Sequence, residues 1–470
     1  MGKTLVIIGV FVLLIFNASA AHIRCENKAY AGTTLVFYRL DDPVTGKKSI
    51  AFSLPVNANG KGEVDFELNK AGYFFSDFGI YRGMLLLLPN ENITLKLPPF
   101  KEKSFVEEKN PYFQPIGFWF VSENGDCLND QVSAFDQTLN QLIDKHFNEL
   151  YLQQSKAALD SIQQTLNAMV PPQASAALLT HKKLKLQLTE ADAFRRAPEA
   201  YSTIFNEIST DMWQTPAFTE LLNKSFDNQL SFMAQAIKGD NVRTAVANQN
   251  LETLRTVVEK QFKVSGSACD LILLKLLHDA FYSNEFSKDA IQNLVGNPYF
   301  TTNKNLQIKT AAVNISQKFS FLTQGSTAPV ICLKNLSGEK ICSDAQPNKF
   351  KYLVFADIET AVCREQLKYL SRINELFSKH LAVYVILRNT QTDVAKTFFA
   401  ENDIDAEIAI DANNKYIDLY KIRSFPQCFL LNEQHQVVFE YAKAPLDGFE
   451  EQFGNWLRNE LFMRQRNQSR

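Results

Sequence analysis

Residues 352–363, with the sequence YLVFADIETAVC, decide the fold of the C-terminal part of the chain. Tyr352 to Ala356 is a continuous apolar run, which is typical of a strand buried on both faces. Apolar positions from Val362 to Phe377 recur at helical spacing, and Leu381 to Leu387 is a second continuous apolar run. The sequence therefore predicts a strand, a helix and a strand at the centre of an α/β domain.

Shorter strands and a closing helix are predicted on either side of this centre. Two pairs of short β-prone runs flank turn-forming residues and indicate two hairpins. They are Ile331–Lys334 with Lys340–Cys342 around Leu336-Ser-Gly-Glu339, and Gln427–Leu431 with Gln436–Tyr441 around Asn432-Glu-Gln-His. Apolar residues from Leu446 to Leu461 mark an amphipathic helix. The predicted order from Gly325 onward is β-β-β-α-β-α-β-β-α.

Residues 325–470 resemble the TlpA-like thioredoxin-fold (redoxin) proteins of the Gram-negative envelope. Five features match that family in order and spacing. They are Gly325-Ser-Thr-Ala-Pro329, the hairpin with Gly338, the strand ending at Phe355-Ala356, the helix beginning around Cys363-Arg364-Glu365, and Phe425-Pro426 before a strand. The resemblance implies a thioredoxin-like domain with a Trp-Cys-x-x-Cys motif at the first long helix and a cis-proline facing it.

The two-cysteine motif of that family is incomplete in this chain. The resemblance places Cys363 at the second, resolving cysteine, while Thr360 occupies the position of the nucleophile and Glu359 that of the tryptophan. Dithiol exchange needs one thiolate to attack and a second thiol to resolve the mixed disulfide. A hydroxyl group has no accessible anion near neutral pH. We therefore expect no conventional dithiol–disulfide turnover at this TxxC site.

The roles of Thr360 and Cys363 remain open between a structural and a chemical one. Thr360 lies three residues before Cys363 at a strand-to-helix junction, so its hydroxyl can cap the helix and contribute about 1 kcal/mol. A helix N-terminus lowers the pKa of a thiol in its first turn. Burial raises that pKa. Cys363 is therefore either an inert core residue or a reactive thiol.

The start of this helix also resembles the core of the peroxiredoxin motif, in which a cysteine attacks peroxide and a threonine orients it. Thr360-Ala-Val-Cys363 carries that resemblance. Two positions depart from it, because Ala356 stands where that family has proline and Pro426 stands about where it has its catalytic arginine. Without the arginine, peroxide loses a charge-assisted hydrogen-bond donor. A peroxidase centred on Cys363 is therefore the alternative hypothesis.

The region around Pro426 is the second candidate site. Pro426 occupies the cis-proline position of the family, and in thioredoxin-like proteins this loop offers backbone groups to an extended substrate. The resemblance makes Phe425, Pro426 and Gln427 the candidate substrate-binding residues. Cys428 follows two residues after Pro426, so it points to the same side of the strand. It is either a resolving partner for Cys363 or a small buried apolar residue.

Cys332 and Cys342 are candidates for a disulfide, because they lie on opposite arms of one predicted hairpin and equally far from Ser337. In register they would face each other, whereas a slip of one residue would separate them. The seven cysteines are an odd number, so at least one thiol is unpaired or intermolecular. Cys25, Cys127 and Cys269 have no recognisable partners.

The remainder of the chain divides into two further regions. Residues 21–110 contain short alternating runs broken by turn residues and predict a β-sandwich, with Met84–Leu88 and Ile93–Leu97 as its last hairpin. Such a β-rich start is also similar to the N-terminal domain of many envelope thioredoxin-like proteins. Residues 111–324 have helical periodicity and predict an all-helical region.

The first residues predict export. Lys3 precedes an apolar run from Leu5 to Phe16, and Ala18-Ser-Ala20 has the small-x-small pattern that signal peptidase cleaves. The run is shorter than the roughly 20 residues needed to cross a bilayer. We expect residues 1–20 to be a cleaved signal peptide, and the protein to be periplasmic or otherwise exported with no membrane span after cleavage.

Composition excludes several classes of partner. The chain has 49 Lys and Arg against 51 Asp and Glu, for a net charge of −2, which argues against nucleic acid. Its six histidines show no metal-ligand spacing, so we expect no metal and no cofactor. The sequence predicts a multidomain α+β and α/β protein: an N-terminal β-sandwich, a helical middle and a thioredoxin-like domain over residues 325–470. Its predicted role is binding an extended peptide or an envelope protein, or vestigial redox activity.

Overall fold

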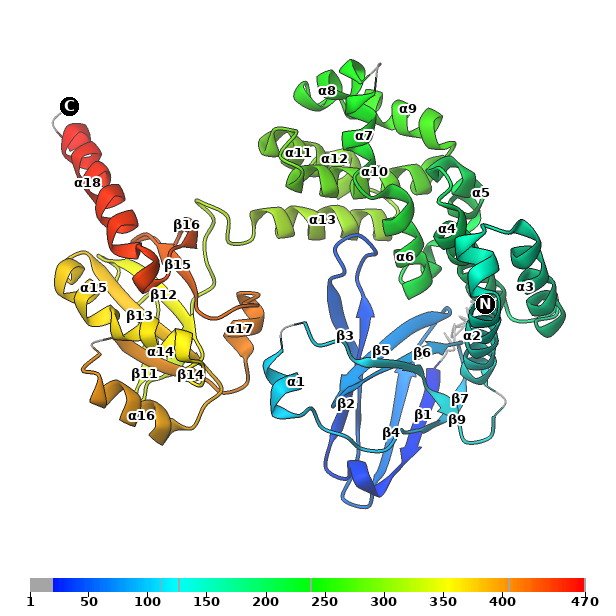
Figure 1. Cartoon of the computed structure of the whole chain (residues 1–470), viewed down its shortest axis with the longest axis horizontal. Helices are drawn as coiled ribbons and strands as arrows, with labels where there is room; N and C mark the ends of the chain where they lie inside the picture. Colours follow the sequence, from blue (N-terminus) through cyan, green and yellow to red (C-terminus); the bar gives the residue numbers. More distant parts are fainter. Residues whose placement is uncertain (1–19, 111, 126, 237–238, 405, 469–470) are drawn as a thin grey trace, which may run out of the picture. The chain divides into compact units, whose positions relative to one another are not determined.

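A computed structural model describes residues 20–470, apart from residues 111, 126, 237–238, 405 and 469–470 (Figure 1). The chain divides into two compact units, Met1–Ser316 and Gln317–Arg470, and each is described by itself. The predicted signal peptide lies outside the described residues except for Ala20, which begins the first strand. Within the described ranges, none of the helices combines the length and the apolar character needed to span a membrane.

The first unit begins with two β-sheets that enclose a common core. The first sheet has the order β4-β1-β7-β9, with β4 (Lys61–Glu67), β1 (Ala20–Glu26), β7 (Asn92–Lys96) and β9 (Val121–Ser122). The second has the order β3-β2-β5-β6-β8, with β3 (Lys48–Pro55), β2 (Thr34–Leu40), β5 (Gly72–Phe78), β6 (Tyr81–Leu87) and β8 (Ile116–Trp119). Ile23 of the first sheet and Phe37 and Phe74 of the second are buried in this shared core.

The second sheet is buried on both faces, and β5 shows why. Side chains of a strand alternate between its two faces. Phe74 points into the core between the sheets, whereas its neighbours Tyr73 and Phe75 belong to a separate core shared with helices. The run Tyr73-Phe-Phe75 is therefore aromatic throughout, because each of its side chains meets a packed layer.

One predicted hairpin is wrong. Met84–Leu88 and Ile93–Leu97 were expected to pair, but β6 pairs with β5 and β8, whereas β7 pairs with β1 and β9 in the other sheet. Leu87 and Ile93 enter the shared core from the two different sheets. The chain therefore crosses from one sheet to the other after β6, which buries both residues, and does not turn back to form a hairpin. The strands also extend past the expected boundary at residue 110, since β8 and β9 follow it.

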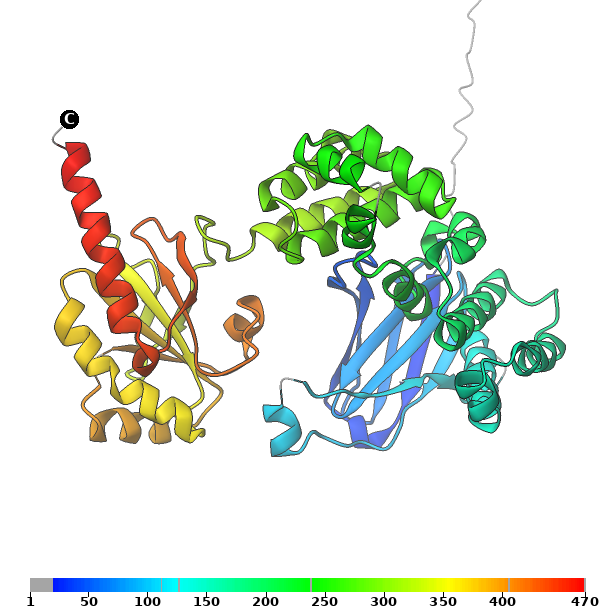
Figure 2. The same cartoon turned by 45° about the horizontal axis from the view of Figure 1, so that its top comes forward.

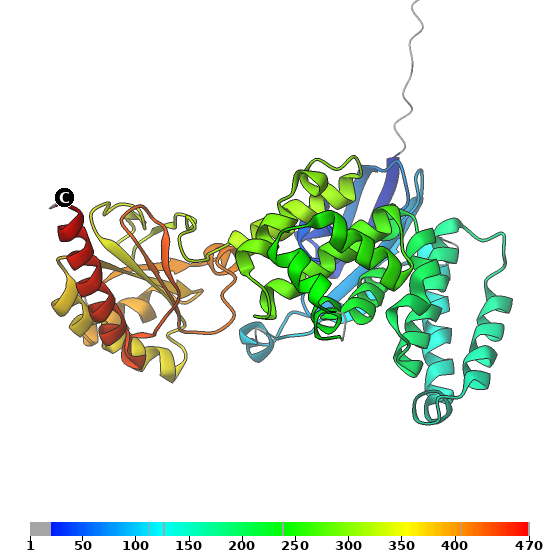
Figure 3. The same ribbon diagram turned by 90° about the horizontal axis from the view of Figure 1, so that it is seen from above.

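Helices form most of the rest of the first unit, and all but α1 lie along one side of the strands (Figures 2 and 3). The helices of eight or more residues are α2 (Leu128–Lys145), α3 (Lys156–Met169), α4 (Ala176–Phe194), α6 (Pro216–Phe226), α8 (Asp240–Ala247), α9 (Leu251–Phe262), α10 (Gly266–Tyr282), α11 (Lys288–Val295) and α13 (Leu306–Ser320). The shorter ones are α1 (Phe105–Lys109), α5 (Ser202–Glu207), α7 (Gln229–Gln235) and α12 (Pro298–Thr301). Many of these helices begin at a side-chain cap, as Ser155 and Ser175 do for α3 and α4.

The second unit contains a five-stranded sheet and a separate hairpin. The sheet has the order β14-β13-β12-β15-β16, with β14 (Glu407–Asp411), β13 (Leu381–Arg388), β12 (Phe350–Ala356), β15 (Gln427–Leu431) and β16 (Val437–Ala442). The hairpin consists of β10 (Cys332–Lys334) and β11 (Lys340–Cys342). The helices are α14 (Ala361–Lys368), α15 (Leu370–Phe377), α16 (Thr392–Glu401), α17 (Lys415–Leu419) and α18 (Phe449–Gln468). β12 runs parallel to β13 and antiparallel to β15.

Both faces of this sheet are covered, as the continuous apolar runs predict. Tyr352 and Val354 pack on one face with residues of α14, α15 and α18. Leu353 and Phe355 pack on the other face with α17. Further backbone pairing extends both edges of the sheet. Asn335 bridges Ala409 of β14, and Gly325 donates a hydrogen bond to the carbonyl of Val437 in β16 at 2.8 Å.

Two details of the second unit differ from the expected elements. The single predicted helix is divided at Tyr369, where α14 ends and α15 begins, and the Tyr369 hydroxyl donates to Glu450 of α18 at 2.7 Å. The sequence interpretation also omitted β14 and α17. β14 is only five residues long and alternates between Ile and smaller or charged residues, so it lacks the continuous apolar signal of β12 and β13.

Candidate functional site

Helix α14, which follows β12, has Thr360 as its N-cap. Thr360 follows the turn after β12, and its Oγ1 accepts a hydrogen bond from the backbone N–H of Cys363 at 3.4 Å. The same hydroxyl donates its proton to the carbonyl of Asp357 at 2.9 Å. The Thr360 hydroxyl therefore acts as both a donor and an acceptor in this turn. This is a structural role that an oxygen atom can fill without a sulfur.

Cys363 lies beneath this turn in the core. Its side chain is 0% exposed and belongs to the apolar cluster of Tyr352, Val354 and Leu367. Burial raises the pKa of the Cys363 thiol, and hydrogen bonds from Thr360 and the Asp357 backbone oppose the shift without cancelling it. The neighbouring Val362 is 63% exposed instead. The structure therefore places a protonated, inaccessible sulfur where the helix begins.

Cys428 lies in the same cluster as Cys363, on β15 and two residues after Pro426. It is 3% exposed, and burial raises the pKa of its thiol to about 12. The neighbouring Cys363 also raises the pKa of the Cys428 thiol. Both are free thiols. Neither has the exposed, electropositive surroundings that activate a cysteine.

The loop before β15 lies at the surface. The peptide bond between Phe425 and Pro426 is cis, and Phe425, Pro426 and Gln427 are all half-buried. Arg423 and Ser424, which precede them, are exposed. In the described part of the chain, the backbone N–H groups of Arg423, Ser424 and Phe425 donate no hydrogen bond. This loop therefore presents free main-chain donors beside half-buried side chains.

Two charged residues near this loop were not predicted from the sequence. The guanidinium of Arg388 lies over the Phe425 ring at 5.5 Å, and its Nη1 is 3.9 Å from a carboxylate oxygen of Asp357. Asp357 is 3% exposed. Asp357 follows β12 and Arg388 ends β13, and parallel strands bring their carboxyl ends to the same edge of a sheet. The positions of Asp357 and Arg388 at the ends of two apolar runs could have predicted that the two residues lie close together.

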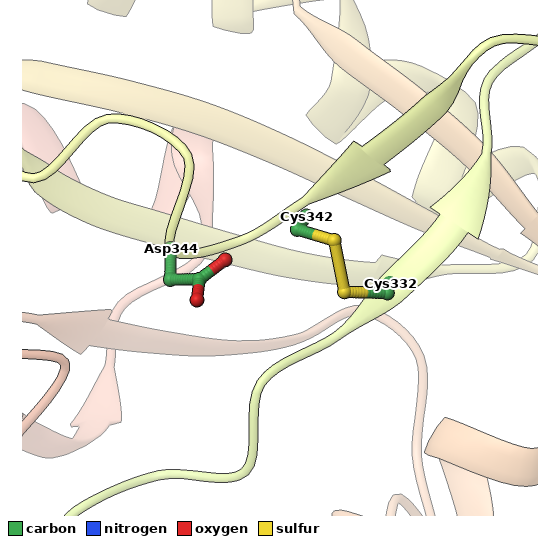
Figure 4. Close-up of side chains that lie close together, drawn as sticks. All are labelled: Cys332, Cys342 and Asp344. Atoms are coloured by element: carbon green, nitrogen blue, oxygen red, sulfur yellow. A yellow bond between two sulfur atoms is a disulfide. The ribbon is translucent and has the colours of Figure 1, made fainter.

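A disulfide joins Cys332 and Cys342 across the hairpin (Figure 4). The two residues are direct partners in the β10–β11 register, which is the arrangement that allows a bond between them. The carboxylate of Asp344 lies beside them, with the three side chains' donor atoms all within 4.8 Å of one another. Because both sulfurs are bonded to each other, neither is available as a thiolate ligand.

Comparison with known proteins identifies the class of the second unit. Residues 324–440 match the model of the AhpC/TSA family. The C-terminal domain is therefore a redoxin domain with a thioredoxin-like fold.

Particular relatives are thiol-disulfide oxidoreductases. ResA proteins of Bacillus cereus and Bacillus anthracis are each 25% identical over 130 residues, which cover 27% of this chain and 75% of the relative. Solved structures include a thioredoxin domain from Bacteroides vulgatus at 18% identity and TM-score 0.26, covering 27% of this chain and 94% of that one. Another is StoA from Bacillus subtilis at 21% identity and TM-score 0.21, covering 23% and 84%.

We expect the buried thiols of Cys363 and Cys428 to resist alkylation in the folded protein. Because burial raises the pKa of Cys363 and of Cys428, the thiolate fraction is small near neutral pH and grows only as the pH rises. Peptide mass mapping after iodoacetamide treatment should find both unmodified in buffer and fully modified in denaturant. Modification of folded Cys363 near pH 7 at the rate of a free thiol would contradict this prediction.

Proposed function

We propose that this protein is exported and that its redoxin domain binds an extended peptide or an envelope protein without conventional dithiol chemistry. The observation that carries the proposal is the use of the Thr360 hydroxyl. It caps α14 at the position where the related oxidoreductases are expected to hold their attacking sulfur. The degenerate TxxC site thus retains a helix cap at this position and lacks the thiol that would attack a disulfide.

The surface around the site supports a binding role. The loop of Arg423, Ser424 and Phe425 offers unsatisfied N–H groups, which an extended chain can use as it would use the edge of a sheet. Exposed apolar side chains flank the start of α14. Val362 is 63% exposed and Leu446 is 49% exposed.

The segment that carries Leu446 is bonded to α14, the helix that carries Val362. The backbone N–H of Leu446 donates to the side-chain carbonyl of Gln366 at 2.7 Å. Gln366 lies four residues after Val362, and residues four apart share one face of a helix. The proposed site therefore combines main-chain donors of the loop with the exposed apolar side chains of Val362 and Leu446.

A photo-crosslinking experiment tests this site. A benzophenone amino acid at position 446 of the exported protein is expected to capture one dominant envelope partner. The change Val362→Asp should reduce that yield at least about fivefold, because a charge then enters the apolar contact. The matched control is Val394→Asp, since Val394 is 50% exposed on α16. Equal loss in both variants, or capture unchanged by Val362→Asp, would contradict the proposal.

The second candidate is a single-cysteine oxidoreductase or peroxidase centred on Cys363. The proximity of Cys428 favours it, since a thiol in the same cluster can resolve an oxidised Cys363. The Arg388 guanidinium is engaged with Asp357 and the Phe425 ring, and the burial of Cys363 opposes attack on peroxide. Peroxide consumption or insulin reduction that disappears in Cys363→Ser would establish this second function and refute the first.

A further inference from the structure

The first unit contains a cavity of about 830 Å³ that the redoxin domain does not contribute to. It lies between the outer face of the second sheet and the helical layer, and its walls come from β2, β5, β6, α6 and α10. Cavities that hold small ligands or peptide segments span about 300–1,000 Å³. This cavity is therefore large enough for several residues of a bound chain.

The floor of the cavity is apolar with one unsatisfied hydroxyl. Leu40, Tyr73 and Phe75 form it, all on the helix-facing side of the sheet. Tyr73 is 4% exposed, yet its hydroxyl makes no hydrogen bond within the part of the chain that the structure describes. Tyr73 lines the cavity, so a molecule in the cavity can reach its hydroxyl. Since burial also raises the pKa of Tyr73, the hydroxyl keeps its proton and can donate it to a ligand.

The cationic side chains at the cavity are already neutralised. Arg82 donates two hydrogen bonds to Asp77, at 2.6 and 2.9 Å. Lys275 is paired with Asp279 one turn along α10, and Lys224 is paired with Asp192. Each of these positive charges therefore has a carboxylate partner that does not itself line the cavity.

Two carboxylates on the cavity wall have no such compensation. Among the described residues, Glu220 has no ion-pair or hydrogen-bond partner, and Asp227 accepts only from the side chain of Asn228. Asp227 is the C-cap of α6, where the helix dipole disfavours a negative charge. Both carboxylates are exposed, so a basic group of a ligand can reach them. The two residues are seven apart on α6, or about 10 Å along the helix axis.

We propose that this cavity binds an extended peptide segment that carries two basic side chains. The basic groups pair with Glu220 and Asp227, an apolar side chain between them packs on Tyr73 and Phe75, and a peptide carbonyl accepts the proton of the Tyr73 hydroxyl. In an extended chain, residues i, i+2 and i+4 share one face and span about 13 Å. Two flexible lysine side chains at i and i+4 can reach carboxylates about 10 Å apart.

Fluorescence anisotropy on the full exported chain tests the proposal with defined probes. The labelled peptide Lys-Ala-Phe-Ala-Lys, blocked at both ends, is expected to bind at low ionic strength. The double change Glu220→Gln with Asp227→Asn should weaken binding about tenfold, since two ion pairs are lost. Tyr73→Phe should weaken it about threefold through one hydrogen bond, without unfolding, because it removes a hydroxyl that has no internal partner.

The controls separate the cavity from general charge effects. Asp240→Asn, whose carboxylate is 94% exposed on α8, should leave the affinity unchanged. The analogue with glutamate in place of lysine should not bind. Three results would overturn the proposal: affinity unchanged in the double variant, equal binding of the glutamate analogue, or binding of 1,5-diaminopentane as tight as that of the peptide. The last result would show that the charges alone select the ligand.

Discussion

Replacing Thr360 by cysteine is expected to create a redox-active pair with Cys363. In the native protein, the Thr360 hydroxyl accepts a hydrogen bond from the backbone N–H of Cys363, so the side chains of residues 360 and 363 meet at the first turn of α14. A sulfur at position 360 is expected to bond with the Cys363 sulfur after a local adjustment. The new thiol would stand at the exposed start of α14, where the helix N-terminus lowers its pKa and favours attack. Cys363, buried below it, would then act as the resolving thiol.

The measurements are a thiol count and an insulin-reduction assay. Counted in denaturant, oxidised Thr360→Cys should have four fewer alkylatable thiols than the same variant after full reduction, two from the new bond and two from Cys332–Cys342. Its insulin reduction should exceed that of the native protein at least about tenfold. The matched control is Thr360→Ser, which keeps a capping hydroxyl and should remain inactive. The interpretation of Thr360 fails if Thr360→Ser or the native protein is as active as the cysteine variant.

The change Phe453→Ala is expected to destabilise the redoxin domain by about 3–5 kcal/mol. Phe453 is 0% exposed and contacts the rings of Phe350, Phe377, Phe449 and Trp456, with centroids between 5.1 and 6.2 Å away. Truncation removes this contact and leaves a cavity that the surrounding aromatic rings cannot close. The same core holds Cys363, so loss of packing would also expose that thiol.

Because the chain has two units, the readout must come from the second unit alone. Alkylation of Cys363, quantified by peptide mass mapping across a urea series, reports its unfolding. With an m value of about 2 kcal/mol/M, the midpoint should fall by about 1.5–2.5 M. The control is Phe462→Ala on the same helix, since Phe462 is 63% exposed and its loss should cost less than about 0.5 kcal/mol. Equal shifts in the two variants would show that the aromatic cluster does not carry this stability.

Local patterns in the sequence predicted much of the second unit. The apolar runs of β12 and β13 were long and continuous because both faces of the sheet are covered. The placement of Thr360 three residues before Cys363 was enough to predict a capped helix. β14 was missed because five residues at a sheet edge carry too weak a pattern to separate from a loop.

Contacts between distant residues were beyond such patterns. The Asp42 side chain accepts local hydrogen bonds from the backbone N–H groups of Val44 and Thr45. It also accepts from Asn314 on α13 at 2.9 Å, across 272 positions of sequence. The layered burial that separates β6 from β7 likewise depends on which elements meet in space. One sequence contains no direct signal for such meetings.

The extra pairing at both edges of the redoxin sheet has a consequence for the behaviour of the protein at high concentration. An open edge strand can form backbone hydrogen bonds with the edge strand of a neighbouring molecule, which can start aggregation. Here a strand of a second molecule would first have to displace the Asn335–Ala409 bridge on one edge or the Gly325–Val437 hydrogen bond on the other. The five strands are thereby protected from self-templated aggregation by segments of their own chain.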